Sequence, residues 1–192
     1  RIVERYAGVF DAVLADDGLH NTFDEGEAVN VLFAPTASGP RAVTQLLQWL
    51  SEEDEQIVLM VYSLRDLTAP GISGSLVDIL RERVDAGVPV YAITDRMQSD
   101  GYWDTTEDTL RNAGVHVWEV SNLTTEFTAM HHKVAVLGRT DIRVVTDAGN
   151  WSKAAMGSSS SMATNVESVL FVDSAALDDN RTGHRYLAQW MR

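Results

Sequence analysis

The sequence contains no cysteine, which excludes disulfide bridges and thiolate metal ligands but leaves open whether the protein is cytoplasmic or secreted. It also contains no run approaching the roughly 20 apolar residues of a membrane-spanning helix, so no transmembrane segment is expected. Positive charge is in short supply, because 15 lysine and arginine residues stand against 28 aspartate and glutamate residues, for a formal net charge of −13. A surface of this sign repels the phosphates of nucleic acids and anionic lipids, so tight binding of DNA would need a local basic cleft.

What remains is the composition of a folded, water-soluble domain. Hydrophobic residues make up 45% of the 192 residues and charged residues 22%, which is enough apolar surface for one substantial core. No Gly-x-Ser-x-Gly motif is present, so a serine hydrolase of the Ser-His-Asp type is not expected. No clustered set of His, Asp and Glu residues points to a metal site, and neither a metal nor another cofactor is expected.

Apolar residues recur with strand spacing and helix spacing in turn along the chain. Continuous or alternating apolar runs predict strands at 29–35, 55–63, 88–95, 115–120, 132–137, 142–147 and 167–173. Apolar residues at helical spacing predict helices at 1–14, 40–50, 73–87, 105–114 and 184–191. This alternation predicts an α/β fold whose mixed β-sheet is flanked by helices on both faces.

The segment AMHHKVAVLG (129–138) places two adjacent histidines and a lysine at the start of a predicted strand. Because side chains alternate along a strand, His131 and Lys133 are expected on one side and His132 on the other. An imidazole and an ammonium that face the same way repel each other if both are charged, unless an anion such as a phosphate lies between them. The pair therefore indicates an anion site, although such residues also occur at ordinary, partly exposed strand ends.

The segments that follow make the chain resemble one half of the phospholipase D superfamily. That family's signature is His-x-Lys, four residues, Asp, then Gly-Ser-x-Asn, with a glutamate further on. TDAGNWSKAA (146–155) is similar to the family's Thr-Gly-Ser-x-Asn-Trp-Thr-Lys-Ala-Ala and places Asn150 at the motif asparagine. TNVESVLFVD (164–173) resembles the family's Asn-x-Glu-Asn strand and places Glu167 at the glutamate. The resemblance covers residues 29–192 and implies a phospholipase D-like domain there.

The resemblance implies a phosphodiesterase that cleaves or transfers a phosphodiester through a phosphohistidine intermediate, without a metal or other cofactor. His131 would act as the nucleophile or as the acid that protonates the leaving oxygen, and Glu167 would orient its ring. Lys133 and Asn150 would hold nonbridging phosphate oxygens. A neutral imidazole is a competent nucleophile near pH 7, so these residue types suit that chemistry. Ser152, close to Asn150, is expected to offer a further hydroxyl to the substrate.

A complete site needs a second His-x-Lys motif, because the chain contains only one. None of the other histidines, among them His20, His116 and His184, has a lysine two residues on. The second motif is expected from an identical chain in a homodimer or from the missing half of a longer polypeptide. Residues 1–28, expected as a helix and linker, resemble the helix that follows a first catalytic half, and the chain begins with Arg1 rather than Met. These features suggest an excised second half, and a homodimer is an equal alternative.

Three positions depart from the family's signature and leave a rival interpretation open. Gly138 stands where the signature has Asp, while Asp147 and Ala148 replace the Gly-Ser pair and remove a hydroxyl that would contact phosphate. A carboxylate near a phosphate weakens its binding, unless strand alternation turns the Asp147 side chain away from the site. The alternative function is therefore a catalytically degenerate domain that binds or scaffolds without turnover. The substrate of an active enzyme would be a phospholipid or, for a nuclease of the same superfamily, a nucleic acid, and the charge of −13 favours the lipid slightly.

Overall fold

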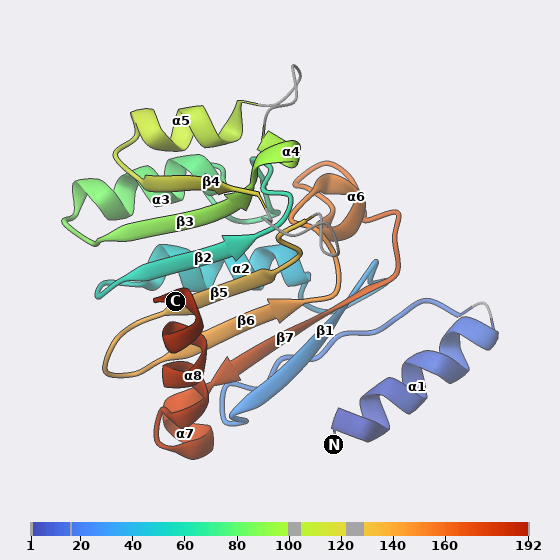
Figure 1. Cartoon of the computed structure of the whole chain (residues 1–192). Helices are drawn as coiled ribbons and strands as arrows, with labels where there is room; N and C mark the ends of the chain where they lie inside the picture. The colour runs from blue at the N-terminus through green and yellow to red at the C-terminus, as the bar shows by residue number, and fades with distance from the viewer. Residues whose placement is uncertain (1, 16, 100–104, 122–128, 192) are drawn as a thin grey trace.

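The computed structural model describes residues 2–15, 17–99, 105–121 and 129–191, which fold around one mixed β-sheet (Figure 1). The strands of these residues are β1 (Val29–Ala34), β2 (Ile57–Val61), β3 (Val90–Asp95), β4 (His116–Val120), β5 (Lys133–Leu137), β6 (Arg143–Asp147) and β7 (Glu167–Asp173). They are ordered β1-β7-β6-β5-β2-β3-β4 across the sheet. Strands β2, β3 and β4 run parallel, whereas every other neighbouring pair is antiparallel.

Helices cover both faces of this sheet (Figure 1). Those of the described residues are α1 (Ile2–Leu14), α2 (Ala42–Glu52), α3 (Leu76–Asp85), α4 (Arg96–Ser99), α5 (Thr106–Asn112), α6 (Lys153–Met156), α7 (Ser174–Asp178) and α8 (Arg181–Trp190). Helices α2 and α3 pack on one face, and α8 and α1 pack on the opposite face. The predicted α/β fold with a mixed sheet and helices on both faces is therefore confirmed.

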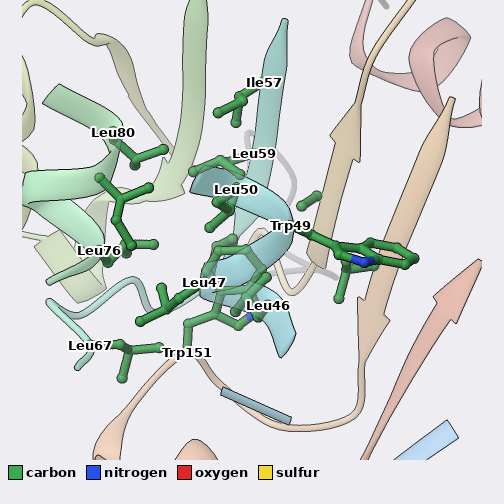
Figure 2. Packing of buried hydrophobic residues seen from close by; sticks show 14 of the residues in the cluster. Leu46, Leu47, Trp49, Leu50, Ile57, Leu59, Leu67, Leu76, Leu80 and Trp151 are labelled. Atoms are coloured by element: carbon green, nitrogen blue, oxygen red, sulfur yellow. The ribbon is translucent and has the colours of Figure 1, made fainter. Parts of the chain in front are cut away.

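Strand β2 shows why its apolar run is continuous rather than alternating. All of its residues are buried. Ile57 and Leu59 belong to the main core cluster with α2 and α3, whereas Val58 and Met60 belong to a second cluster beneath α8. Figure 2 shows the main cluster, in which leucines of α2 and α3 pack against β2 and against Trp151. Each fully buried leucine of this kind contributes about 1.5–3 kcal/mol, so this cluster fixes the strands that carry the site.

The edge strand β1 is held by a buried asparagine from the segment that precedes it. Asn21 Nδ2 donates to Phe33 O at 2.8 Å, and Phe33 N donates to Asn21 Oδ1 at 2.9 Å. Helix α1 packs against the same strand, because Val9 and Ala12 contact the small apolar cluster that contains Phe33. The segment before the sheet is thus tied to its first strand by both polar and apolar contacts.

Candidate active site

Three neighbouring strands bring polar residues together at one end of the strands, in the interior of the sheet's strand order. Strand β5 begins at Lys133, β6 ends at Asp147 and β7 begins at Glu167, and the three strands are adjacent and antiparallel. Each of these residues lies two positions from a main-cluster residue on its own strand, so the three side chains share the face covered by α2 and α3. Those main-cluster residues are Ala135, Val145 and Val169. The sheet thus places an ammonium near two carboxyl groups.

His131 and Lys133 contact each other on one side of the chain, which confirms the prediction from strand alternation. Lys133 Nζ lies 3.1 Å from His131 Nε2 and donates to His131 O at 3.2 Å. Only 6% of Lys133 is exposed, whereas His131 is exposed. A buried ammonium therefore supports an imidazole that solvent and substrate can reach.

The surroundings of Lys133 favour a neutral imidazole at His131. Burial lowers the pKa of Lys133, and the carboxyl groups of Asp147 and Glu167 act in the opposite direction. An ammonium has no hydrogen-bond acceptor, so while Lys133 keeps its proton the Nε2 atom of His131 has to accept. An accepting Nε2 carries no proton, so this contact assigns the ring proton to Nδ1. The Nε2 lone pair becomes free to attack when the ammonium turns to another acceptor.

The ring of Tyr62 packs beside His131 and Lys133, a contact that the sequence did not predict. Its ring centroid lies 4.6 Å from that of His131 and 5.2 Å from Lys133 Nζ. Gln98 Nε2 donates to the Tyr62 hydroxyl at 3.0 Å, which fixes the ring. An ammonium over an aromatic face is stabilised by the ring quadrupole. The only signal in the sequence is that Tyr62 directly follows the buried strand β2, whose pairing with β5 could not be read from the sequence.

Strand alternation does not turn the Asp147 side chain away from the site. Its Oδ1 accepts from Gly149 N at 2.7 Å, and its Oδ2 is buried with no hydrogen-bond partner among the described residues. Burial raises the pKa of Asp147 to about 7; the Glu167 carboxylate adds to the rise, while Gly149 N–H and Lys133 oppose it. Asp147 is therefore a carboxyl group that is partly protonated at neutral pH.

Glu167 lies near Lys133 but is not bonded to His131. Its Oε1 accepts from Asn165 Nδ2 at 3.2 Å, and no hydrogen bond joins it to His131 in the described part of the chain. Gly149 makes room for its side chain, because a Cβ atom at that position would lie 2.6 Å from Glu167 Cδ. Its predicted role in orienting the histidine thus stays a prediction, whereas its charge near Lys133 is a feature of the structure.

Asn150 and Ser152 lie in the turn between β6 and α6. Trp151, which is fully buried in the main cluster, anchors this turn. Asn150 Oδ1 is buried without a hydrogen-bond partner among the described residues, so its amide is uncommitted at the site end of β6. Ser152 is the N-cap of α6 and accepts from Ala155 N at 3.4 Å. Its hydroxyl proton remains available as a donor, and its contact with substrate stays a prediction.

Gly138, the first departure from the signature, lies far from the site. It follows the opposite end of β5 from Lys133, about 16 Å away along an extended strand. Its φ is +83°, and a Cβ atom there would lie 2.7 Å from Asp141 O in the hairpin turn. Glu55 accepts from Thr140 N at 2.8 Å in the same turn. The tight turn therefore accounts for glycine at this position, and a side chain there would lie far from the strand ends that carry Lys133, Asp147 and Glu167.

Restoring the signature residue with Gly138→Asp should destabilise the protein by about 1–3 kcal/mol, because a side chain in left-handed backbone is strained. Activity per folded molecule should not change. Urea unfolding measures the first effect, and initial rates at low temperature measure the second. Gly87→Asp is the control for backbone strain alone: its φ is +86° and no atom lies within 4 Å of an added Cβ, so it should destabilise the protein less than Gly138→Asp, whose Cβ would also meet Asp141 O at 2.7 Å. Stability of Gly138→Asp equal to that of the unchanged protein would contradict the argument.

The described residues contain neither a metal-ligand cluster nor a membrane-crossing helix. No group of three or more His, Asp or Glu side chains among them is placed to hold a metal ion. Of the helices in the same ranges, none is both long enough and apolar enough to cross a bilayer.

Known proteins resemble this chain in structure but not detectably in sequence. The sequence matches no protein-family model and no curated protein. The solved structure of Nuc from Salmonella typhimurium, described as a phospholipase D family member, is 22% identical with a TM-score of 0.63, covering 85% of this chain and 91% of that one. NucT from Helicobacter pylori is 18% identical with a TM-score of 0.64, covering 85% and 92%. Yeast tyrosyl-DNA phosphodiesterase is 13% identical with a TM-score of 0.51, covering 80% of this chain and 48% of that one. At these identities the likeness establishes the fold.

Proposed function

We propose that this chain, which has the phospholipase D fold, carries one half of a phosphodiesterase site whose reactive group is His131. The observation that carries the proposal is the contact at 3.1 Å between the exposed His131 ring and the buried Lys133 ammonium. A fixed positive charge beside a neutral, accessible imidazole is the arrangement that attack on a phosphate needs. Because Lys133 is buried, its side chain is already ordered before the substrate binds.

In the first step, Lys133 Nζ turns from His131 Nε2 to a nonbridging phosphate oxygen, and the freed Nε2 lone pair attacks phosphorus, so an N–P bond forms while the bond from phosphorus to the leaving oxygen breaks. The leaving oxygen takes a proton from a second, protonated histidine. In the second step, that now neutral histidine removes a proton from water, whose oxygen attacks phosphorus and displaces His131. Lys133 and Asn150 hold the nonbridging oxygens, on which negative charge grows in each transition state.

The second histidine has to come from another His-x-Lys motif, because this chain has only one. An identical chain in a homodimer and the other half of a longer polypeptide are the two sources. Exposure of the His131 ring supports both, since a partner can approach it directly. Glu167 is the proposed orienting carboxylate, and Ser152 is the proposed further donor to substrate. Support for both comes from their positions at the strand end and turn that flank Lys133.

Two kinds of phosphodiester remain as substrates. The name of the yeast neighbour, a tyrosyl-DNA phosphodiesterase, supports a nucleic acid and thus a nuclease. The net charge of −13 supports a phospholipid. Comparing rates on single-stranded DNA and on a phosphatidylcholine vesicle at two salt concentrations separates the two, because phosphate contacts to DNA weaken steeply with salt.

The proposal is tested by hydrolysis of bis(4-nitrophenyl) phosphate in the presence of EDTA. We expect release of nitrophenolate that persists in the chelator. If a second copy completes the site, specific activity should rise with protein concentration as light scattering detects dimers. A sample that scatters as a dimer yet neither hydrolyses the diester nor forms a phosphoenzyme would contradict the proposal.

The second candidate is a degenerate domain that binds a phosphodiester without turnover. The presence of Asp147 inside the site, next to Ala148 in place of a hydroxyl, favours it. The double variant Asp147→Gly with Ala148→Ser should gain activity if these residues are damage. Loss of activity in that variant would instead show that the Asp147 and Ala148 pair belongs to a working site.

A further inference from the structure

We propose that Asp147 is a proton-carrying ligand of the substrate phosphate, which binds a nonbridging oxygen through its own O–H and so has to be protonated whenever the site is occupied. The inference rests on the proposed function, because that function places the phosphate at Lys133. It assigns to Asp147 a direct role in binding, where the sequence suggests only interference.

The two oxygens of Asp147 have different surroundings. Oδ1 is fixed by the N–H of Gly149 at 2.7 Å, which anchors the carboxyl group on the turn. Oδ2 is buried and has no hydrogen-bond partner in the ranges that the structure describes. An unmet buried acceptor is unfavourable, but a protonated Oδ2 becomes a donor, and rotation of the carboxyl group toward Lys133 would bring it to an incoming phosphate oxygen.

The charges that face Asp147 come from the strands on both sides of β6. Lys133 on β5 faces it with a positive charge, and Glu167 on β7 faces it with a negative charge. His131 joins this group through its contact with Lys133. With both carboxyl groups ionised the cluster carries a net negative charge, and a phosphodiester anion would be repelled. Protonation of Asp147 makes the cluster neutral.

This protonation is easily reached in neutral solution. Burial raises the pKa of Asp147 to about 7, and the Glu167 carboxylate acts in the same direction. A bound phosphate adds another negative charge nearby and has to raise the pKa further. Binding of the anion and uptake of a proton by Asp147 are therefore coupled, and affinity should fall as the pH rises above about 7.

The neighbouring substitution fits the same role. The signature's Gly-Ser pair offers a hydroxyl, and this chain has lost it at Ala148, whose position is exposed. A protonated Asp147 returns an O–H donor one residue earlier. Ala148 is exposed and, as the residue that directly follows Asp147 at the end of the strand, points to the opposite side, so Asp147 is the member of the pair that lies near Lys133.

The test measures binding of bis(4-nitrophenyl) phosphate by titration calorimetry. The background is the His131→Ala variant, which cannot form the phosphoenzyme and has no imidazole at position 131 to exchange protons. The ligand is a monoanion throughout the pH range, so protons come only from the protein. Three proteins are compared at pH 6 and pH 8, each in buffers of different ionisation enthalpy. They are His131→Ala alone and the same variant with Asp147→Asn or Asp147→Ala.

With Asp147 present, we expect uptake of about one proton at pH 8, and affinity that falls by up to about tenfold per pH unit above pH 7. Asp147→Asn should bind without proton uptake and equally well at both pH values, because its amide keeps a donor. Asp147→Ala should also take up no proton but should bind about tenfold more weakly than Asp147→Asn, because it lacks the donor. If the Asp147→Ala variant binds as tightly as the Asp147→Asn variant, Asp147 acts only as a repulsive charge and the inference is overturned.

Absence of proton uptake in the presence of Asp147, or equal uptake after its replacement by asparagine, would likewise overturn it. No binding even at pH 6 would contradict this inference and the phosphate site together. Binding with the expected proton uptake, together with an unchanged protein that scatters as a dimer but neither hydrolyses the diester nor forms a phosphoenzyme, would retain the inference and overturn the proposed enzyme. Thermal unfolding checks that the variants fold. Because the pKa of Asp147 is raised by folding, the protein loses stability as the pH rises from about 4 to about 7, and Asp147→Asn removes that loss.

Discussion

Replacement of His131 by alanine should lower turnover of bis(4-nitrophenyl) phosphate by roughly 10³-fold or more, the range expected when a nucleophile or general acid is lost. In a homodimer the single substitution removes both histidines of the site at once. The fold should persist, because the ring is exposed and Lys133 keeps its bond to the backbone carbonyl of residue 131. Steady-state rates of purified, folded protein measure the effect.

His132→Ala is the matched control for that variant. His132 is the adjacent residue, is also exposed, and is tied to β2 through its backbone, since its carbonyl accepts from Tyr62 N at 2.7 Å. Its replacement should leave turnover within a few-fold of the unchanged protein. Equal losses in the two variants would mean that the segment, and not the His131 imidazole, is needed.

Lys133→Met should lower kcat/KM by roughly 10²–10³-fold, because a fixed donor and charge at the growing phosphate charge is lost. Methionine keeps an unbranched side chain of similar reach against the Tyr62 ring, so packing changes little. The rates are compared per folded molecule, because the variant removes the desolvation cost of the ammonium and also its attraction to Asp147 and Glu167.

The control is Lys153→Met, which replaces the only other lysine of the sequence. Lys153 is exposed on α6, the helix that follows the Asn150 turn, and so it tests whether any positive charge in this region suffices. Activity should be retained in Lys153→Met. If both lysine variants lose activity equally, Lys133 has no special role in the site.

The sequence was informative wherever a pattern is local. The two-residue alternation of side-chain direction along residues 131–133 correctly predicted that His131 and Lys133 share a side, because an extended strand allows no other arrangement. The continuous apolar run of β2 correctly predicted a strand buried on both faces. Both predictions depend only on neighbours along the chain.

The rest of the site depends on which strands are neighbours in space. Tyr62 reaches His131 only because β2 pairs with β5, and Asp147 meets Lys133 only because β6 is the other partner of β5. Gly138 is close to Lys133 in sequence but lies at the opposite end of the same strand. The spacing of the signature therefore made Gly138 look relevant, and it left the position of Asp147 undecided.

The pairing of Asn21 with Phe33 restricts how two copies of this chain can meet. Asn21 uses both the N–H and the carbonyl of Phe33 on the open side of β1. A strand from another molecule therefore cannot extend the sheet through this point without displacing a buried side chain, so edge-to-edge aggregation is suppressed there. A dimer that completes the proposed site should therefore not form by continuous pairing of a strand along β1 through Phe33.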